Sequence, residues 1–284
     1  GERIARNSII QIHFDEPIRP NAITGLAQNP AFVNIIYGDV NVRGAWRVAN
    51  SYQTVEFIPE EPCGANSCGD PMFCLSLTCP DGEPNCTSQP YQILVRTGAL
   101  LSPGGANFEA IPFSGVVDMA DNALDGDSDG TPDGKPAMPG DTFARIGSTA
   151  NPPNEDQPDN YLWRFIVENR IDRTAPNIVR MTPAIDGEDV VSDAPVRIWF
   201  SHVMSVESLG NIAIAEFGLP APQEDDQPVD PMWFRPRADI AENRTVVSVD
   251  HRVFGPNRQN AYYFTSIPST VRAVNQNCVY PGRG

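Results

Sequence analysis

Four aspartates in one short run form the strongest candidate site in the sequence. Asp125, Asp127 and Asp129 alternate along the chain, Gly130 follows them, and Asp133 closes the run. Carboxylates at alternate positions before a glycine can be aimed at one point by a single turn, which is what a calcium ion needs. The spacing therefore predicts calcium binding; the alternative is a solvent-exposed acidic turn without an ion. Calcium is favoured because four carboxylates this close repel one another without a cation.

The run is not a regular EF-hand loop, because Pro136 stands where that loop has a bidentate glutamate. It resembles instead the Asp-rich loops of thrombospondin type 3 repeats, and the resemblance implies calcium as a cofactor. Further carboxylates lie on both sides of the run. Asp118, Asp121 or Asp141 could complete the coordination shell.

Cysteines form the second group of candidate residues. Five of the six lie in one loop-like segment rich in Gly, Pro, Asn and Ser, at positions Cys63, Cys68, Cys74, Cys79 and Cys86. Their spacing lacks the paired Cys-x-x-Cys of common structural zinc sites, so disulfides are favoured over zinc. Dense disulfides indicate an oxidising compartment. Because five is odd, at least one of these cysteines pairs elsewhere or stays free. Cys278 is the remaining cysteine of the sequence that could pair with it. Alternatively, Cys278 pairs with a residue beyond Gly284.

The sequence contains none of the common catalytic motifs. His13, His202 and His251 belong to no metal-binding His motif, and neither a Gly-x-Ser-x-Gly elbow nor a phosphate-binding glycine loop occurs. The adjacent Glu60 and Glu61 do not give the defined separation of glycosidase carboxylates. We therefore expect a protein that is not an enzyme.

Aromatic residues could bind a carbohydrate. The four tryptophans, Trp46, Trp163, Trp199 and Trp233, could form a platform for sugar rings. Packing in the core or at a sheet edge is the commoner place of tryptophan in β-sandwiches. An exposed aromatic pair beside a groove would favour the binding interpretation.

An internal repeat organises the elements that must position these residues. The stretch that begins at Gly187 matches the stretch that begins at Gly1: Val190, Asp193, Val196, Ile198 and Phe200 fall on Ile4, Asn7, Ile10, Ile12 and Phe14. Apolar and other residues alternate in both copies, which predicts a strand with one face in a core. A repeat of this kind decides the architecture.

Alternating patterns predict six strands in each half of the chain. In the first half they lie near 8–14, 32–37, 40–48, 53–58, 91–96 and 161–167. In the second half they lie near 177–181, 194–200, 211–216, 231–235, 244–249 and 261–266. Short strands separated by many Pro and Gly residues indicate an all-β protein.

Several motifs resemble the SbsA-type bacterial Ig-like domain. Residues 174–187 supply its Pro-containing edge strand and Asp-Gly turn, and Phe-Ser-His-Val-Met at 200–204 closes the next strand. Later family landmarks occur at 54–59, 91–95 and 118–124. The resemblance implies two tandem Ig-like β-sandwiches in a bacterial cell-surface setting.

The repeat divides the chain into two domains. The first covers 1–170, with a Cys-rich insertion at 60–90 and the Asp-rich loop at 118–141; the second covers 174–284. The linker at 169–173 is very short, which predicts a stiff tandem. The insertion has no counterpart in the second copy, so we expect it to decorate the fold rather than to support it.

Charge and hydropathy exclude two classes of partner. The chain of 284 residues carries a net charge of -16 and contains no basic stripe, which argues against nucleic acid and anionic membrane surfaces. No apolar run approaches the ~18 residues of a membrane-spanning helix, so membrane insertion is not expected.

We therefore expect an extracellular, non-enzymatic structural segment of a bacterial surface protein: a spacer, a surface-layer or adhesin segment, or a filament subunit. A carbohydrate- or partner-binding accessory module is the alternative. The first copy lacks its opening edge strand and the second lacks its closing strand. Either the sequence is a window on a longer array, or copies exchange strands head to tail, with a neighbour's strand beside Ile10, Ile12 and Phe14.

Overall fold

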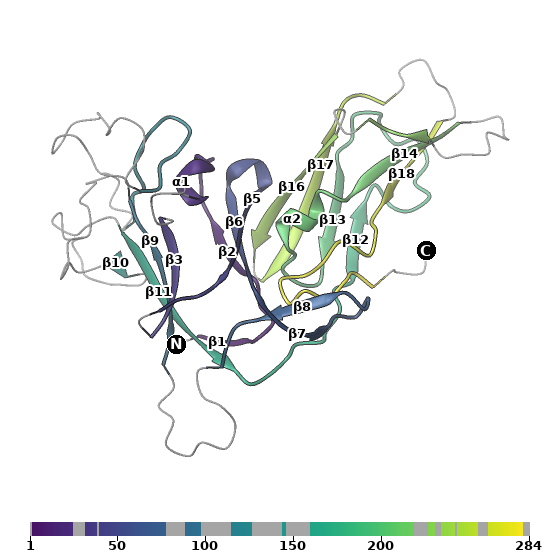
Figure 1. Cartoon of the computed structure of the whole chain (residues 1–284). Coiled ribbons are helices and arrows are strands. Elements are labelled where there is room, and N and C mark those ends of the chain that lie inside the picture. Colours follow the sequence, from purple (N-terminus) through teal and green to yellow (C-terminus); the bar gives the residue numbers. More distant parts are fainter. Residues whose placement is uncertain are drawn as a thin grey trace.

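The computed structural model describes residues 2–24, 32–38, 40–77, 89–97, 115–126, 144–145, 160–218, 227–230, 234–241, 243–254 and 261–280. These residues form an all-β protein, as predicted (Figure 1). Its strands make two β-sandwiches, each packed around its own hydrophobic core.

Two sheets build the first sandwich. The larger sheet runs in the order β1 (Glu2–Ala5), β11 (Tyr161–Glu168), β9 (Tyr91–Val95), β3 (Val33–Tyr37) and β4 (Val40–Asn41), with β10 (Ala144–Arg145) also beside β11. The smaller sheet runs β2 (Ile10–His13), β6 (Thr54–Pro59) and β5 (Gly44–Ala49). Ile12 and Phe57 from the small sheet pack with Ile93 and Phe165 from the large one.

The second sandwich has the same plan. One sheet runs β12 (Ile178–Thr182), β13 (Val196–Phe200), β17 (Arg244–His251) and β16 (Phe234–Ala241); the other runs β15 (Gln227–Pro228), β14 (Ala213–Gly218) and β18 (Ala261–Ser266). Ile198, Phe200, Ile214 and Val247 are buried in its core. Short helices join strands in both halves: α1 (Asn21–Thr24), η1 (Asn50–Tyr52) and α2 (Val206–Leu209).

The internal repeat is visible in the pairing registers. Ile10 pairs with Phe57 across β2 and β6, and its counterpart Val196 pairs with Val249 across β13 and β17. A matching turn follows later in each half. The backbone of Asp118 donates to Asn122 O and that of Ala273 donates to Asn277 O, both at 2.9 Å. Asn277 thus takes the place of Asn122 in the second sandwich.

Several predicted elements differ from the structure. The stretch predicted as one strand at 40–48 is two strands, because the chain crosses from one sheet to the other: β4 pairs with β3, and β5 pairs with β6. The strand predicted near 231–235 is β16, which runs further, to Ala241. The Cys-rich insertion contains an antiparallel hairpin, β7 (Glu61–Ala65) and β8 (Pro71–Cys74), where a loop was expected.

The two sandwiches differ at their edges. Strand β13 continues to β12, whereas its counterpart β2 ends its sheet among the described residues. Strand β9 continues to β11, whereas its counterpart β18 ends its sheet there. These two edges are the ones that lack a strand in the sequence comparison.

Candidate functional site

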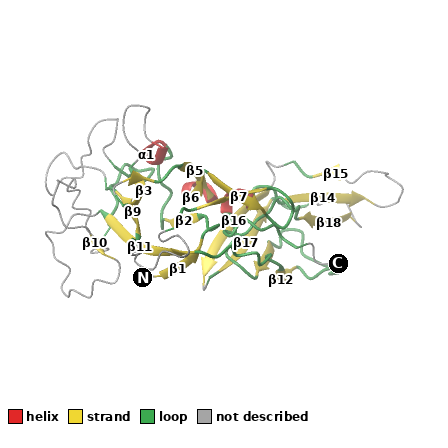
Figure 2. Ribbon diagram, turned by 60° about the horizontal axis from the view of Figure 1, so that its bottom comes forward, coloured by secondary structure: helices red, strands yellow, loops and turns green. Residues whose placement is uncertain are grey.

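The junction between the two sandwiches is organised around β6, a strand that is buried on both faces. Val55 and Phe57 point into the first core, with exposed fractions of 0% and 1%. Thr54 and Glu56 lie on the opposite face of the sheet and are also 0% exposed. That face is covered by the second sandwich. Figures 1 and 2 both show β5 and β6 between the sheet that contains β9 and the sheet that contains β16.

Glu56 caps the first turn of α2 across this junction. Its Oε1 accepts hydrogen bonds from the backbone of Val206 at 2.6 Å and from the Gln11 amide at 2.5 Å. Its Oε2 accepts from the Ser205 hydroxyl at 2.9 Å and from the backbone of Glu207 at 3.2 Å. The carboxylate therefore satisfies N–H groups that the start of a helix leaves unpaired, a task that the Ser205 side chain at the N-cap does not perform.

Burial dominates the electrostatics of Glu56. Loss of hydration raises the pKa of its carboxyl above the ordinary glutamate value, and the four hydrogen bonds offset part of that rise. Arg47, which lies opposite Glu56 on β5, pairs instead with Glu207 at 3.6 Å. The junction therefore holds this carboxylate with neutral donors.

A loop from the second sandwich forms a second polar contact. The side-chain amide of Gln276 donates to Asn7 O at 3.0 Å and to Phe73 O at 2.5 Å, and its Oε1 accepts from the backbone of Phe73 at 2.9 Å. The amide of Asn7 donates to Asn275 O at 2.7 Å and to Asp172 O at 2.8 Å. Asn7 and Gln276 are almost fully buried, so these bonds replace water at the junction.

The Cys-rich insertion joins this contact covalently. A disulfide between Cys63 and Cys74 closes the β7–β8 hairpin, and a second links Cys68 in the hairpin to Cys278 in the second sandwich. Asp70 pairs with Arg272 at 2.8 Å across the same boundary. Four of the six cysteines proposed for disulfides are thus paired in the structure.

The expectation that the insertion is decoration is wrong for its described part, because the hairpin bridges the two sandwiches. Asn66 of the insertion also contacts the second sandwich, since its amide donates to Gln276 O at 2.9 Å. Cys79 and Cys86 lie outside the described residues.

Asn50 makes a third contact at the far end of β5. Its amide donates to Ala238 O and its Oδ1 accepts from the backbone of Ala238, both at 3.0 Å. Asn50, Ser51 and Tyr52 all have positive φ, at 51°, 60° and 73°. Asparagine tolerates this region better than most residues, so the turn can present its amide to β16.

The carboxylates proposed for calcium are only partly described. Asp118 accepts from the backbones of Ala120 and Asn122 at 2.8 and 2.7 Å and from the Asn122 amide at 2.7 Å. Burial opposes ionisation of Asp118, but these hydrogen bonds outweigh it and lower the pKa of its carboxyl. Asp121 forms an ion pair with Arg19. Asp118 is thus engaged within its own turn and Asp121 with a residue from another segment.

The rest of the Asp-rich loop lies at or beyond the limit of the described residues. Asp125 is described, whereas Asp127, Asp129, Asp133 and Asp141 are not. Among the described residues no group of three or more potential metal-ligating His, Cys, Asp or Glu side chains occurs. Calcium binding by the run stays a prediction.

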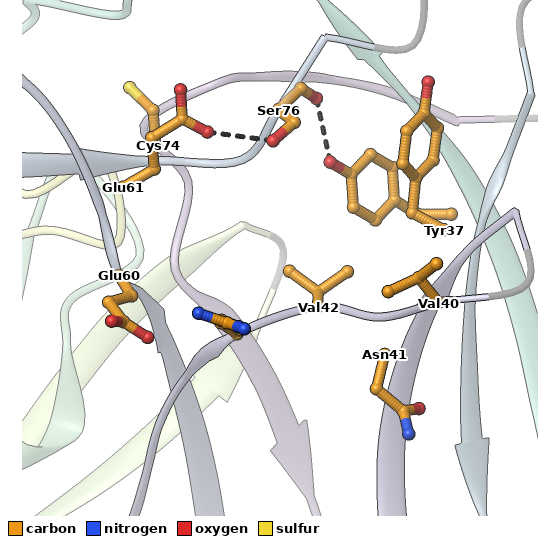
Figure 3. Close-up of a pocket in the computed structure, with 10 residues that line it drawn as sticks. Tyr37, Val40, Asn41, Val42, Glu60, Glu61, Cys74 and Ser76 are labelled. Atoms are coloured by element: carbon orange, nitrogen blue, oxygen red, sulfur yellow. Dashed lines mark hydrogen bonds between the residues drawn. The ribbon is translucent and has the colours of Figure 1, made fainter.

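A pocket of about 380 Å³ lies where the insertion meets the first sandwich (Figure 3). Tyr37 and Tyr91 stack in its wall with ring centroids 4.8 Å apart, and the Tyr91 hydroxyl donates to Ser76 O at 2.8 Å. The Ser76 hydroxyl donates to Glu61 Oε2 at 2.8 Å. Val40 on the rim is 69% exposed. Burial raises the pKa of Tyr91, so its phenol is a neutral hydrogen-bond donor.

Tryptophans and histidines do not gather at this pocket. Trp46 and Trp163 are half-buried against the first core, and Trp199 lies under the guanidinium of Arg180, 4.9 Å from its ring centroid. Trp233 lies outside the described residues. His13 contacts Thr54, His202 contacts Ser201, and His251 contacts Ala194 and Arg252, so the three imidazoles form no cluster.

No protein-family model, curated protein or solved structure matches this chain. In the described part of the chain, no helix has the length and apolar character needed to cross a membrane.

Sequence reasoning named the junction cysteines Cys68 and Cys278 but missed the polar residues that build the junction. Glu56, Gln276 and Asn66 are polar residues in turns or on the outward phase of a strand, where solvent exposure is the ordinary expectation. A weak signal was present for Gln276, which stands in the repeat at the place of Asp121; the structure gives both residues a positive φ, at 64° and 70°.

Proposed function

We propose that this chain is an extracellular structural segment of a bacterial surface protein, in which two Ig-like sandwiches work as one rigid unit without catalysis. The observation that carries the proposal is the junction, where a buried carboxylate, a buried glutamine and a disulfide hold the two halves in one orientation. If the two halves moved independently, the short linker alone would join them, and none of these contacts would be needed.

Other features support this setting. Two disulfides are typical of proteins from oxidising compartments. The strand order β12-β13-β17-β16 opposite β15-β14-β18 is compatible with the Ig-like assignment, which otherwise rests on the sequence resemblance. The partners that suit such a segment are neighbouring Ig-like domains or further copies of the chain.

Distance distributions between the halves test the rigid unit. Spin labels introduced through non-natural amino acids at Val40 and Val179, which are 69% and 56% exposed, report on the two sandwiches. We expect one narrow distance distribution, as narrow as that of a control pair at Val40 and Met119 within the first sandwich. A distribution across the junction much broader than the control pair would reject the proposal.

A second candidate is recognition of a polar ligand, such as a carbohydrate, at the pocket lined by Tyr37. The favouring observation is the stacked pair Tyr37 and Tyr91 beside a cavity of about 380 Å³. Only one ring of the pair is available, because Tyr91 is 0% exposed. A glycan array with the native chain tests it, with Tyr37→Ala expected to abolish binding and Tyr52→Ala, at an exposed tyrosine outside the pocket, expected to retain it. An array without any signal would exclude this candidate for the glycans displayed.

A further inference from the structure

The outer edge of β2 presents backbone groups without a strand partner. The backbone of Phe14 donates to Gln53 O at 2.9 Å, which continues the β2–β6 pairing. Backbone groups alternate between the two edges of a strand, so the N–H and C=O of Gln11 and His13 face away from β6. Among the described residues, β6 is the one strand that pairs with β2.

The second sandwich shows what occupies this edge. At the equivalent edge of β13 lies β12, antiparallel, with Thr182 opposite Arg197, Met181 opposite Ile198, and Arg180 opposite Trp199. In the repeat, Arg197, Ile198 and Trp199 stand at the places of Gln11, Ile12 and His13. The chain therefore contains its own example of a strand that fits this edge.

The same register shows where such a strand would lie relative to the second sandwich. The second sandwich touches this edge at Ile9, whose backbone donates to Val274 O at 2.7 Å. A strand placed as β12 is placed would run along Gln11 to Asp15, past that contact. His13 and Asp15 in this stretch are exposed, and Phe14 is half-buried.

The side chains limit what an added strand gains. Ile10 and Ile12 are already buried, at 5% and 7% exposure, so the chain itself covers the core beneath β2. The favourable free energy of binding an added strand must therefore come from backbone hydrogen bonds, from further burial of Phe14 and from attraction between opposite charges. Partial burial lowers the pKa of His13, and the negative charges of Asp239 and Asp15 nearby offset part of that shift. The surroundings of His13 are thus acidic and favour a basic side chain, such as the one that β12 carries at Arg180.

We propose that the outer edge of β2, from Gln11 to Asp15, binds an extended segment of another polypeptide as an antiparallel strand. The bound segment carries apolar side chains opposite Ile12 and Phe14 and a basic side chain opposite His13, as β12 does for β13. The inference deepens the proposed function, on which it rests, by naming the surface through which a partner polypeptide with such a segment attaches. Main-chain pairing gives the affinity, and the apolar and basic positions give the specificity.

Hydrogen exchange with a peptide tests this site. The probe is a synthetic peptide with the sequence Asn177–Pro183, added to the native chain. We expect amide exchange at Gln11 and His13 to slow about tenfold at a peptide concentration of about ten times its Kd. A control peptide with proline in place of Arg180 lacks the N–H that would face His13 and is expected to give no protection.

Three results overturn the proposal. One is the absence of protection at any peptide concentration. Another is binding of the peptide without protection of Gln11 and His13, which would mean that the peptide binds elsewhere, for example in place of β12. The third is slow exchange of Gln11 and His13 without peptide, which would mean that a segment of the same chain covers the edge. None of these results changes the distance distribution across the junction, so failure of this site and failure of the rigid unit are distinguishable.

Discussion

Replacement of Glu56 by alanine removes the acceptor for four hydrogen bonds at the junction. Gln11 and Ser205 can compensate, because the Gln11 amide also donates to Met204 O at 2.7 Å and the Ser205 hydroxyl can rotate. The backbone N–H groups of Val206 and Glu207 cannot compensate. A buried donor left unpaired costs about 1–3 kcal/mol, so two of them lower the free energy of unfolding by about 2–6 kcal/mol.

Replacement of Glu56 by glutamine has a much smaller expected effect. The retained oxygen still accepts from Gln11 and Val206, and the new amide group can donate to the Ser205 hydroxyl. The loss is the longest bond, from the backbone of Glu207 at 3.2 Å, and the gain is the removal of a buried charge. These terms oppose each other, and we expect a net change within about 1 kcal/mol.

The pH dependence of Glu56 has a definite sign. Its folded-state pKa is raised, so between the unfolded and folded pKa values the folded chain binds a proton that the unfolded chain does not. The contribution of Glu56 to stability is therefore complete below the unfolded value and is lost as the pH rises through the folded value. Compared with the Glu56→Gln variant, the native chain becomes relatively more stable as the pH is lowered through this window.

Urea unfolding followed by tryptophan fluorescence measures these differences, since Trp46 and Trp199 report on different sandwiches. Glu207→Ala is the matched control, because Glu207 is an exposed acid on the same helix and its ion pair with Arg47 contributes about 0–1 kcal/mol. The reasoning is refuted if Glu56→Ala is as mild as Glu207→Ala. It is also refuted if Glu56→Gln is as damaging as Glu56→Ala.

Three further predictions concern the cation, the long disulfide and the crossing between sheets. Calcium at about a hundred times its Kd should raise the stability of a chelator-treated sample by about 2.7 kcal/mol through the run Asp125–Asp133; calorimetry without binding at millimolar calcium argues against the site. The double variant Cys68→Ser, Cys278→Ser opens a loop with a sequence separation of 210 and should lose about 5 kcal/mol by chain entropy; a loss below about 3 kcal/mol, the value for a short hairpin loop, contradicts this. Gly44→Ala should lower the melting temperature, because a Cβ there overlaps the Phe57 ring and Ile58 O and overpacking costs about 1–3 kcal/mol; an unchanged transition contradicts the close approach.

Local patterns in the sequence predicted the strands but not the contact between the sandwiches. The alternation of Ile10 and Ile12, and of Val55 and Phe57, placed these side chains in a core, because period-two burial depends on neighbours within one sandwich. Glu56 lies on the other phase of the same alternation, where solvent exposure is the ordinary expectation. It is buried because α2, about 150 residues further along the chain, packs on its face of the sheet.

A glycine marks the division of the 40–48 stretch in the sequence. Gly44 interrupts an otherwise apolar alternation, and a glycine inside a strand pattern often marks a bend or a close backbone approach. The structure places Gly44 at the start of β5 against Phe57, where the chain enters the second sheet. The role of the insertion had a partial signal, because its odd number of cysteines left Cys278 as a candidate partner, although cysteine spacing alone does not determine pairing.

The disulfide between Cys68 and Cys278 also fixes the route that mechanical tension takes through the molecule. A pull between the first sandwich and the residues after Cys278 follows the shortest covalent path, which crosses directly from one sulfur to the other. The short linker, the second core and the strands of the second sandwich lie on the long branch and carry no load. The second sandwich is therefore shielded from such a pull while the bond is intact, and reduction transfers the full tension to it.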